Sequence, residues 1–159
     1  LDENMGQLNE RQAEVLRLKY IGFVFQSFYL VPTLTVIENT SYFLSQLGLN
    51  RKQAYQRAEE TLRLLGLQDH INKKPSELSG GQRQRVAIAR AIAKRPVVVL
   101  ADEPTANLDS KTADTIIAAF HELQNLHQTS FVFATHDSHL MSFAHDVLSL
   151  KDGMISGGH

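Results

Sequence analysis

Short apolar runs that end in polar residues predict the strands of an α/β protein. Residues 21–25, 97–101 and 130–134 are almost continuously apolar, which is the pattern of strands buried in a parallel sheet. The run at 97–101 is rich in valine, and we expect it to be the central strand. A last strand at 147–150 turns back through Lys-Asp-Gly into Met154-Ile155.

Apolar residues at helical spacing predict helices before, between and after these strands. Four of them begin after a residue whose side chain can cap a helix. The expected caps are Asn9, Thr35, Ser79 and Ser110. A further helix covers 51–65 and ends at Gly66. Residues 34–95 therefore form an all-helical insert between the first two strands.

One helix start, within residues 75–90, has the features of an anion-binding site. Ser79 stands where an N-cap belongs, and Gln82 lies three residues on, as in a capping box. The free N–H groups of a helix start stabilise a nearby anion by about 0.3–1 kcal/mol. Gly80 and Gly81 lack the side chains that would keep a phosphate at a distance. These residues alone leave an ordinary capped helix after a turn as the alternative.

Polar residues follow each of the first three strands, at Gln26, Asp102-Glu103 and His136. Parallel α/β sheets bind ligands at the carboxyl ends of their strands, so we expect these side chains to converge. Asp102 fits a Mg²⁺ ligand, directly or through water, and His136 can donate to a phosphate or orient a water. The alternatives are that Gln26 only ends a strand, that one acid caps the next helix, and that the histidine is structural.

Composition excludes several kinds of partner and chemistry. Seventeen acidic residues against 16 basic ones give a net charge of −1, so the chain has no electrostatic footprint for nucleic acid or anionic lipid. It has no cysteine, which excludes disulfides and thiolate chemistry. No apolar run reaches the roughly 18 residues of a membrane span, so we expect no direct membrane insertion. No glycine precedes a lysine, so the phosphate-binding loop G-x-x-x-x-G-K-[ST] does not occur in this sequence.

The string Leu-Ser-Gly-Gly-Gln at residues 78–82, with Gln-Arg-Val-Ala-Ile-Ala-Arg at 84–90, shifts the balance between these alternatives. It resembles the signature of ATP-binding-cassette (ABC) ATPases, and the likeness extends over nearly the whole chain. By this likeness the other motifs are a Q-loop glutamine at Gln26, a Walker B strand at 97–102, a catalytic base at Glu103, a D-loop at 106–109 and a switch histidine at His136. The motifs look most like the branch of lipoprotein-release and macrolide-export ATPases, although Ala106 stands where that branch usually has glycine.

The fold implied by the resemblance is a P-loop-NTPase-like parallel sheet core with a helical signature subdomain. The chain looks like a fragment that lacks the N-terminal strands and the phosphate loop of that core. Residues 1–33 would belong to the ATPase core with the Q-loop, 34–95 to the signature subdomain, and 96–159 to the rest of the core. We expect such a fragment alone to bind ATP weakly and to hydrolyse none.

In this family two subunits close head to tail on two ATP molecules. The residues that the resemblance places against nucleotide are Ser79, Gly80, Gly81, Gln82 and Asp109. Asp102 and Gln26 would hold Mg²⁺ and water. Glu103 would polarise the attacking water, and His136 would stabilise the developing charge.

The resemblance also implies a membrane partner, an integral permease that contacts Gln26 to Leu34. The protein would be a bacterial ATPase held on the cytoplasmic face of the inner membrane by that permease. Two alternatives stay open: a catalytically silent regulatory or scaffolding cassette that naturally lacks the phosphate loop, and a non-transport ABC ATPase. A Gly-Lys-Ser/Thr loop encoded upstream of Leu1 would decide against the silent cassette. A DNA-repair type needs a long heptad insert, for which the region between Gln26 and Leu78 is too short.

Overall fold

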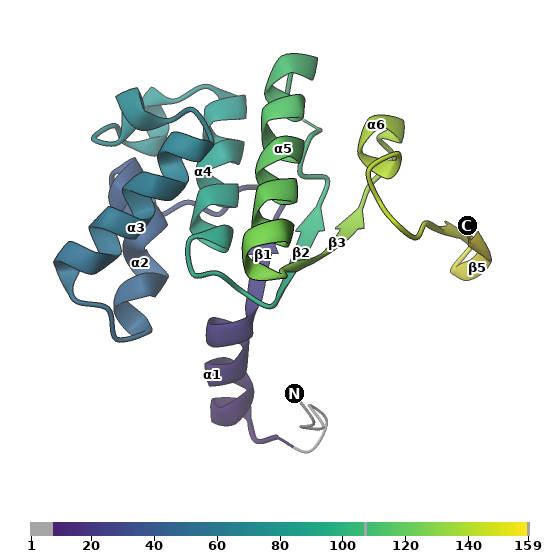
Figure 1. Ribbon diagram of the computed structural model, residues 1–159, viewed down its shortest axis with the longest axis horizontal. Helices are drawn as coiled ribbons and strands as arrows, with labels where there is room; N and C mark the ends of the chain where they lie inside the picture. The colour runs from purple at the N-terminus through teal and green to yellow at the C-terminus, as the bar shows by residue number, and fades with distance from the viewer. Residues whose placement is uncertain (1–7, 107, 159) are drawn as a thin grey trace.

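The computed structural model describes residues 8–106 and 108–158, and its centre is a three-stranded parallel sheet (Figure 1). The strands, in their spatial order, are β1 (Ile21–Val24), β2 (Val98–Asp102) and β3 (Ser130–Ala134). Ile21 pairs with Val98, and Val98 pairs with Ser130. Because the strands are parallel, their carboxyl ends share one edge. The predicted α/β class and the central place of β2 are confirmed.

A helical insert connects β1 to β2. Its elements are α2 (Val36–Gln46), α3 (Arg51–Leu64) and α4 (Gly80–Ile92), with the 3₁₀ turns η2 (Gln68–His70) and η3 (Pro75–Glu77) before α4. Helix α2 packs against both α3 and α4. Thr35 and Ser79 cap α2 and α4 as predicted, each in a capping box. Gly66, after α3, has a φ of +65°, a conformation that favours glycine.

Helix α5 (Ser110–His127) connects β2 to β3 and forms a β-α-β unit with them. Its buried Phe120 packs against both phenylalanines of β3, with ring centroids 4.8 and 5.5 Å apart. The prediction that Ser110 caps this helix is wrong. The Asp109 carboxylate accepts the capping hydrogen bond from the Thr112 N–H, and Ser110 is the first helical residue.

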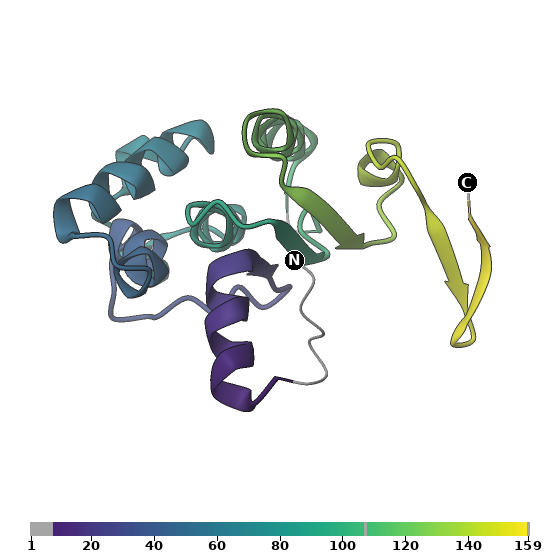
Figure 2. The same ribbon diagram turned by 60° about the horizontal axis from the view of Figure 1, so that its bottom comes forward.

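Helices α4 and α5 lie along the same side of the sheet (Figure 2). Strand burial alternates accordingly: Val99 and Ala101 of β2 are buried, whereas Val98 is only partly buried. On β3, Val132 is 56% exposed. The prediction that these strands are buried holds for one face of β2 and is wrong for β3, which has no buried residue. A continuous apolar run shows that both faces suit burial, but the described helices α4 and α5 cover only one of them.

In the sequence, one further helix precedes the strands of the sheet and another follows them. Helix α1 (Glu10–Tyr20) precedes β1, and Asn9 caps it as predicted. The short helix α6 (Ser138–Met141) follows β3 and was not predicted. Its N-cap is Asp137, which accepts a hydrogen bond from a backbone N–H in the first turn. None of the helices in residues 8–106 and 108–158 is long and apolar enough to span a membrane.

The chain then forms a hairpin of β4 (Leu148–Lys151) and β5 (Met154–Gly158). These two strands are antiparallel and form a sheet of their own. The turn has a positive φ at both Asp152 and Gly153, which is the type I′ geometry that suits a tight hairpin. The predicted turn at Lys-Asp-Gly is confirmed.

Candidate functional site

The carboxyl ends of β2 and β3 bring Glu103 and His136 into contact. Glu103 Oε1 lies 2.6 Å from His136 Nδ1 and accepts a second hydrogen bond from the His136 backbone N–H at 3.2 Å. Glu103 Oε2 accepts a hydrogen bond from the Thr135 hydroxyl at 3.1 Å. Both oxygens of the carboxylate therefore have partners that fix its orientation.

The backbone at Glu103 contributes to this arrangement. Its φ is +47°, a left-handed conformation that costs a non-glycine residue roughly 1–2 kcal/mol. The Glu103 N–H donates to Ala134 O at 2.9 Å, which holds the turn against the end of β3. Strain of this kind is common at functional sites. The His136 side chain is 87% exposed and that of Glu103 only 18%, so the pair presents its imidazole to solvent.

Asp102 and Gln26 stand at neighbouring strand ends, because Val24 of β1 pairs with Ala101 of β2. Both side chains are exposed. Within the described ranges, no group of three His, Cys, Asp or Glu side chains is arranged to hold a metal ion. Mg²⁺ commonly takes one or two carboxylates and completes its shell with phosphate oxygens and water. A carboxylate and an amide at neighbouring strand ends are therefore a donor set that suits Mg²⁺ arriving with a nucleotide.

The start of α4 is shaped by its own capping box. The Ser79 hydroxyl accepts a hydrogen bond from the Gln82 N–H at 3.3 Å, and Gln82 Oε1 accepts one from the Ser79 N–H at 2.9 Å. The Gln82 amide nitrogen lies 2.7 Å from His70 Nε2. Since both polar atoms of the Gln82 side chain have partners within the chain, an anion here would meet the Ser79 hydroxyl and backbone N–H groups first.

Gly80 faces open space. Apart from the adjoining residues and the backbone of its own helical turn, a Cβ added at this position would meet no atom within 4 Å, and the φ of Gly80 lies outside the left-handed region. Neither packing nor backbone conformation within this chain therefore requires a glycine. A ligand that approaches from outside would explain it, because the missing side chain leaves the backbone N–H groups accessible.

Asp109 acts as the N-cap of α5. Its Oδ2 accepts a hydrogen bond from the Thr112 hydroxyl at 2.8 Å, and its Oδ1 accepts one from the Thr112 N–H at 3.0 Å. These hydrogen bonds, that of the hydroxyl first, lower the pKa of Asp109 below its usual value. Asn107, in the middle of the predicted D-loop, lies outside the described residues. The contact of Asp109 with nucleotide stays a prediction.

Sequence reasoning missed several residues that hold the strand-end loops. The buried Thr105 hydroxyl donates to Asp137 Oδ2 at 2.8 Å and so ties the loop after β2 to the loop after β3. Gln84 of α4 donates to Pro104 O at 3.0 Å, and Arg90 of α4 donates to the loop after β1. The available signal was a large polar side chain at Gln84 and Arg90 on a helix whose neighbouring positions are apolar.

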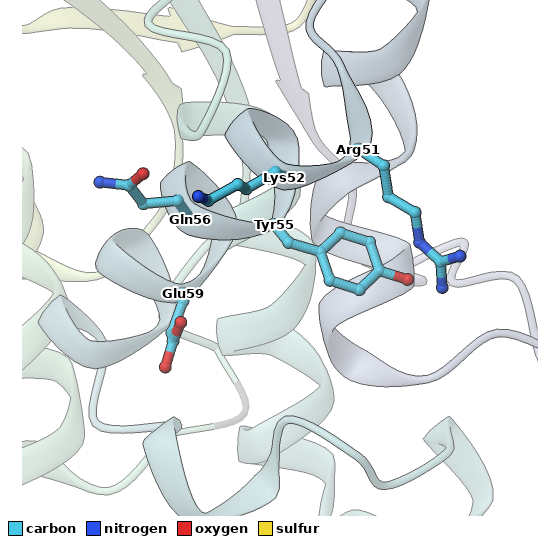
Figure 3. Close-up of a pocket in the computed structure, with 5 residues that line it drawn as sticks. All are labelled: Arg51, Lys52, Tyr55, Gln56 and Glu59. Atoms are coloured by element: carbon cyan, nitrogen blue, oxygen red, sulfur yellow. The ribbon is translucent and has the colours of Figure 1, made fainter.

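Two hollows of the surface lie away from the strand ends. One, of about 710 Å³, is lined by α3 alone, with the Arg51 guanidinium 5.2 Å from the centre of the Tyr55 ring (Figure 3). The other, of about 350 Å³, lies between α3 and the final turns of α4 and α5. Neither is lined by Glu103 or His136. The candidate site is therefore distinct from both hollows, and the side chains of His136, Asp102 and Gln26 there are exposed.

A comparison with protein-family models matches residues 2–106 to the model described as ABC transporter. The chain belongs to the ABC transporter family. The lipoprotein-releasing system ATP-binding protein LolD of Aquifex aeolicus is 44% identical over 149 residues, which are 94% of this chain and 66% of that protein. The ABC transporter ATP-binding protein YtrE of Bacillus subtilis is 41% identical over 94% of this chain and 65% of its own length. The chain thus spans slightly less than two thirds of these ABC relatives.

Solved structures of ABC cassettes superpose closely on this chain. The dimeric structure of MJ0796, a bacterial ABC transporter cassette, gives a TM-score of 0.90 at 38% identity over 96% of this chain and 67% of that one. A dimeric post-hydrolysis state of MJ0796 bound to ADP and Pi gives the same TM-score over 68% of its chain. The predicted family, its α/β cassette fold and the likeness to lipoprotein-release ATPases are confirmed.

Proposed function

We propose that this chain is the nucleotide-binding part of an ABC transporter and that it couples ATP hydrolysis to the movement of a substrate by membrane partners. The observation that carries the proposal is the contact of Glu103 with His136, 2.6 Å apart at the strand ends. The relationship of this chain to transporter ATP-binding proteins also supports the proposal. A head-to-tail dimer is supported by MJ0796, which was solved as a dimer.

Glu103 and His136 both act in the hydrolysis step, Glu103 on the attacking water and His136 on the phosphate. Glu103 accepts a hydrogen bond from the attacking water and polarises it toward the terminal phosphate of ATP. His136 donates a hydrogen bond to a phosphate oxygen as negative charge develops there. Because Nδ1 of the ring contacts Glu103, Nε2 is the nitrogen that meets the phosphate. A ring that donates to Glu103 through Nδ1 also donates to the phosphate through Nε2 only in its imidazolium form, in which both nitrogens carry a proton. The high exposure of the imidazole supports this role.

Asp102 and Gln26 would hold Mg²⁺ beside the same phosphate. When bound, Mg²⁺ neutralises phosphate charge and orients the group that is transferred. The Asp102 carboxylate supplies an anionic ligand, directly or through water, and the Gln26 amide supplies an oxygen. Their exposure and their neighbouring strand ends support the assignment.

The start of α4 would contact the nucleotide that a second copy holds. The Ser79 hydroxyl and the N–H groups of Gly80 and Gly81 donate to the terminal phosphate, where the helix dipole favours negative charge. The open space at Gly80 supports this contact. Gln82, the partner of Ser79 in the capping box of α4, and Asp109, the N-cap of α5, would lie beside the nucleotide.

The division of the chain into an ATPase core at 1–33 and 96–159 and a signature subdomain at 34–95 belongs to this proposal. Residues Gln26 to Leu34 would contact an integral permease, and the exposed ring of Tyr29 supports a docking role. The protein would then lie on the cytoplasmic face of a bacterial inner membrane, held by that permease. Bacterial relatives support this location. If the gene encodes a Gly-Lys-Ser/Thr phosphate loop upstream of Leu1, the alternative of a catalytically silent cassette is excluded.

Glu103→Gln in the full-length protein tests the proposed function. The amide keeps the shape of the side chain but loses the charge that polarises water. ATP turnover should fall by about 10²–10⁴-fold, the usual contribution of a positioned base, while ATP binding is kept. Steady-state phosphate release and equilibrium ATP binding measure the two effects.

His136→Ala should also disable turnover, because the phosphate loses its hydrogen-bond donor. His139→Ala is the matched control, since His139 pairs with Asp114 of α5 rather than with Glu103. Turnover unchanged by Glu103→Gln would remove Glu103 from the role of base and would overturn the proposed mechanism.

A further inference from the structure

The loop after β1 contains two aromatic residues in an unfavourable backbone conformation. Phe28 has a φ of +63° and Tyr29 a φ of +46°. The left-handed region disfavours bulky side chains, and such residues persist there only where the surroundings hold them. The structure must therefore contain a contact that holds this segment, which lies just beyond Gln26.

That contact is made by Arg90 of α4. Its Nη2 donates to Phe28 O at 2.9 Å, and its Nη1 donates to Tyr29 O. In an extended chain the carbonyls of consecutive residues point in opposite directions, so one guanidinium can reach both only where the backbone turns. The planar fork of an arginine suits two such acceptors side by side. The left-handed conformation therefore places both carbonyls within reach of the one arginine, and the two hydrogen bonds stabilise that conformation.

The burial of Arg90 supports this interpretation. The residue is 9% exposed, and its burial lowers the pKa of the guanidinium. Across the part of the chain that the structure describes, no carboxylate forms an ion pair with it. A buried charge is costly unless hydrogen bonds satisfy it. The Phe28 and Tyr29 carbonyls are the partners that satisfy this one.

Further contacts hold the same segment against the helical insert. The Arg83 guanidinium of α4 lies 5.8 Å from the centre of the Phe28 ring. Asn39, fully buried in α2, accepts a hydrogen bond from the Val31 N–H at 2.8 Å and donates to Val31 O at 3.1 Å. The loop after β1 is thus bonded to α4 and α2.

The held segment presents aromatic surface. The Tyr29 side chain is 65% exposed, and its ring packs edge-on against the partly exposed Phe25 at 5.2 Å between centroids. The carbonyl groups of the segment face inward to Arg90 while the Tyr29 ring faces out. A substitution at the buried Arg90 would therefore change the aromatic surface, although Arg90 is not itself part of that surface.

We propose that Arg90 is a positioning residue for the contact between this protein and its permease. By holding the Phe28 and Tyr29 carbonyls, it fixes the Tyr29 ring on the surface and makes the loop move with α4. Since Ser79 caps α4 and Arg90 lies near its other end, a shift of the nucleotide contact would reach Tyr29 through the helix. The inference rests on the proposed function, in which residues 26–34 face the permease and the start of α4 faces ATP.

Hydrogen exchange tests the structural half of the inference without reference to transport. Arg90→Met removes both hydrogen bonds, and the amides of residues 26–31 should exchange at least about tenfold faster, because the segment opens locally. Arg90→Lys keeps the charge and can serve one carbonyl, so its effect should be intermediate. Ile88→Val, at another buried position of α4, is the control and should leave these amides unchanged.

The inference is overturned if the hydrogen exchange of the amides of residues 26–31 is unchanged in both Arg90 variants. If Arg90→Met fails to fold, Arg90→Lys decides, and the exchange of α5 reports whether the rest of the fold is intact. Equal loss of protection in the Ile88→Val control would assign the effect to general destabilisation and would also count against Arg90.

The functional half is measured on the full-length protein with its permease. Arg90→Lys should reduce the permease-dependent part of ATP turnover several-fold and leave the KM for ATP unchanged. An unchanged permease-dependent part, in a variant with altered exchange at 26–31, would overturn the coupling role. If the permease fails to stimulate even the unaltered protein, the proposed function fails together with the coupling role, and the exchange data alone decide whether Arg90 positions the loop.

Discussion

The edge of the sheet and the start of α4 are both polar, but only the sheet edge is completed by the chain itself. At the sheet edge the Glu103 carboxylate has partners in Thr135 and His136. At the start of α4, Gly80 faces open space although its helix start suits an anion. Under the proposed function this difference is expected, because the chain would build its own catalytic geometry and leave its phosphate contact for a second copy.

Gly80→Ala should give the largest effect, because it should reduce ATP turnover without lowering the stability of the fold. The added methyl group has room within the chain, so the free energy of unfolding should stay the same or rise by up to about 1 kcal/mol. It would push the phosphate away from the backbone, and a misplacement of about 1 Å costs on the order of 100-fold in rate. ATP turnover and urea unfolding of the full-length protein measure the two quantities.

Gly48→Ala provides the matched control for that comparison. Gly48 also faces open space but has a φ of +87°, so alanine there should lower the stability by about 1 kcal/mol and leave turnover unchanged. If Gly80→Ala behaved like Gly48→Ala, the start of α4 would have no role in phosphate contact.

Thr105→Val should have a smaller effect, confined to the self-contained sheet edge. It removes the hydroxyl that donates to Asp137 and should lower the free energy of unfolding at pH 7 by about 0.5–1.5 kcal/mol. That hydrogen bond is the first cause of the lowered pKa of Asp137, whose usual value is 3.8.

The pH dependence of the Thr105→Val effect follows from the lowered pKa. A carboxyl whose pKa is lower in the folded state contributes stability above its usual pKa and loses it as the pH falls through the folded value. The difference between Thr105→Val and the unaltered protein should therefore shrink below pH 3.8. Denaturant unfolding at pH 7 and pH 3 measures it, and an equal difference at both pH values would contradict the assignment to Asp137.

Local hydrogen bonds explain which parts of the fold could be predicted. Asn9, Thr35 and Ser79 cap their helices through a backbone N–H three residues away, so neighbouring positions contain the whole signal. The same reasoning failed at Ser110, because Asp109 beside it caps equally well. The sequence pattern around two adjacent candidates does not show which of them accepts the hydrogen bond.

Distant contacts explain most of what could not be predicted. Arg90 lies 61 positions from Tyr29, and Thr105 lies 32 positions from Asp137, so no local pattern pairs them. The left-handed backbone at Glu103 has no sequence signal either, because glutamate rarely adopts it. The strand-end positions were predictable because parallel strands place their ends on one edge, but the orientation of each side chain depends on the loops around it.

The most direct test of the division between the two regions is the molar mass of the full-length Glu103→Gln protein, measured by light scattering with and without MgATP. Because slow hydrolysis leaves ATP between the two copies, the mass should double when MgATP is added. A second change in the same protein, Gly80→Asp, places a negative charge at the proposed phosphate contact and should keep the mass at that of one copy. The account would be contradicted by a molar mass that does not change when MgATP is added. It would also be contradicted if the mass doubled in the protein that carries both Glu103→Gln and Gly80→Asp.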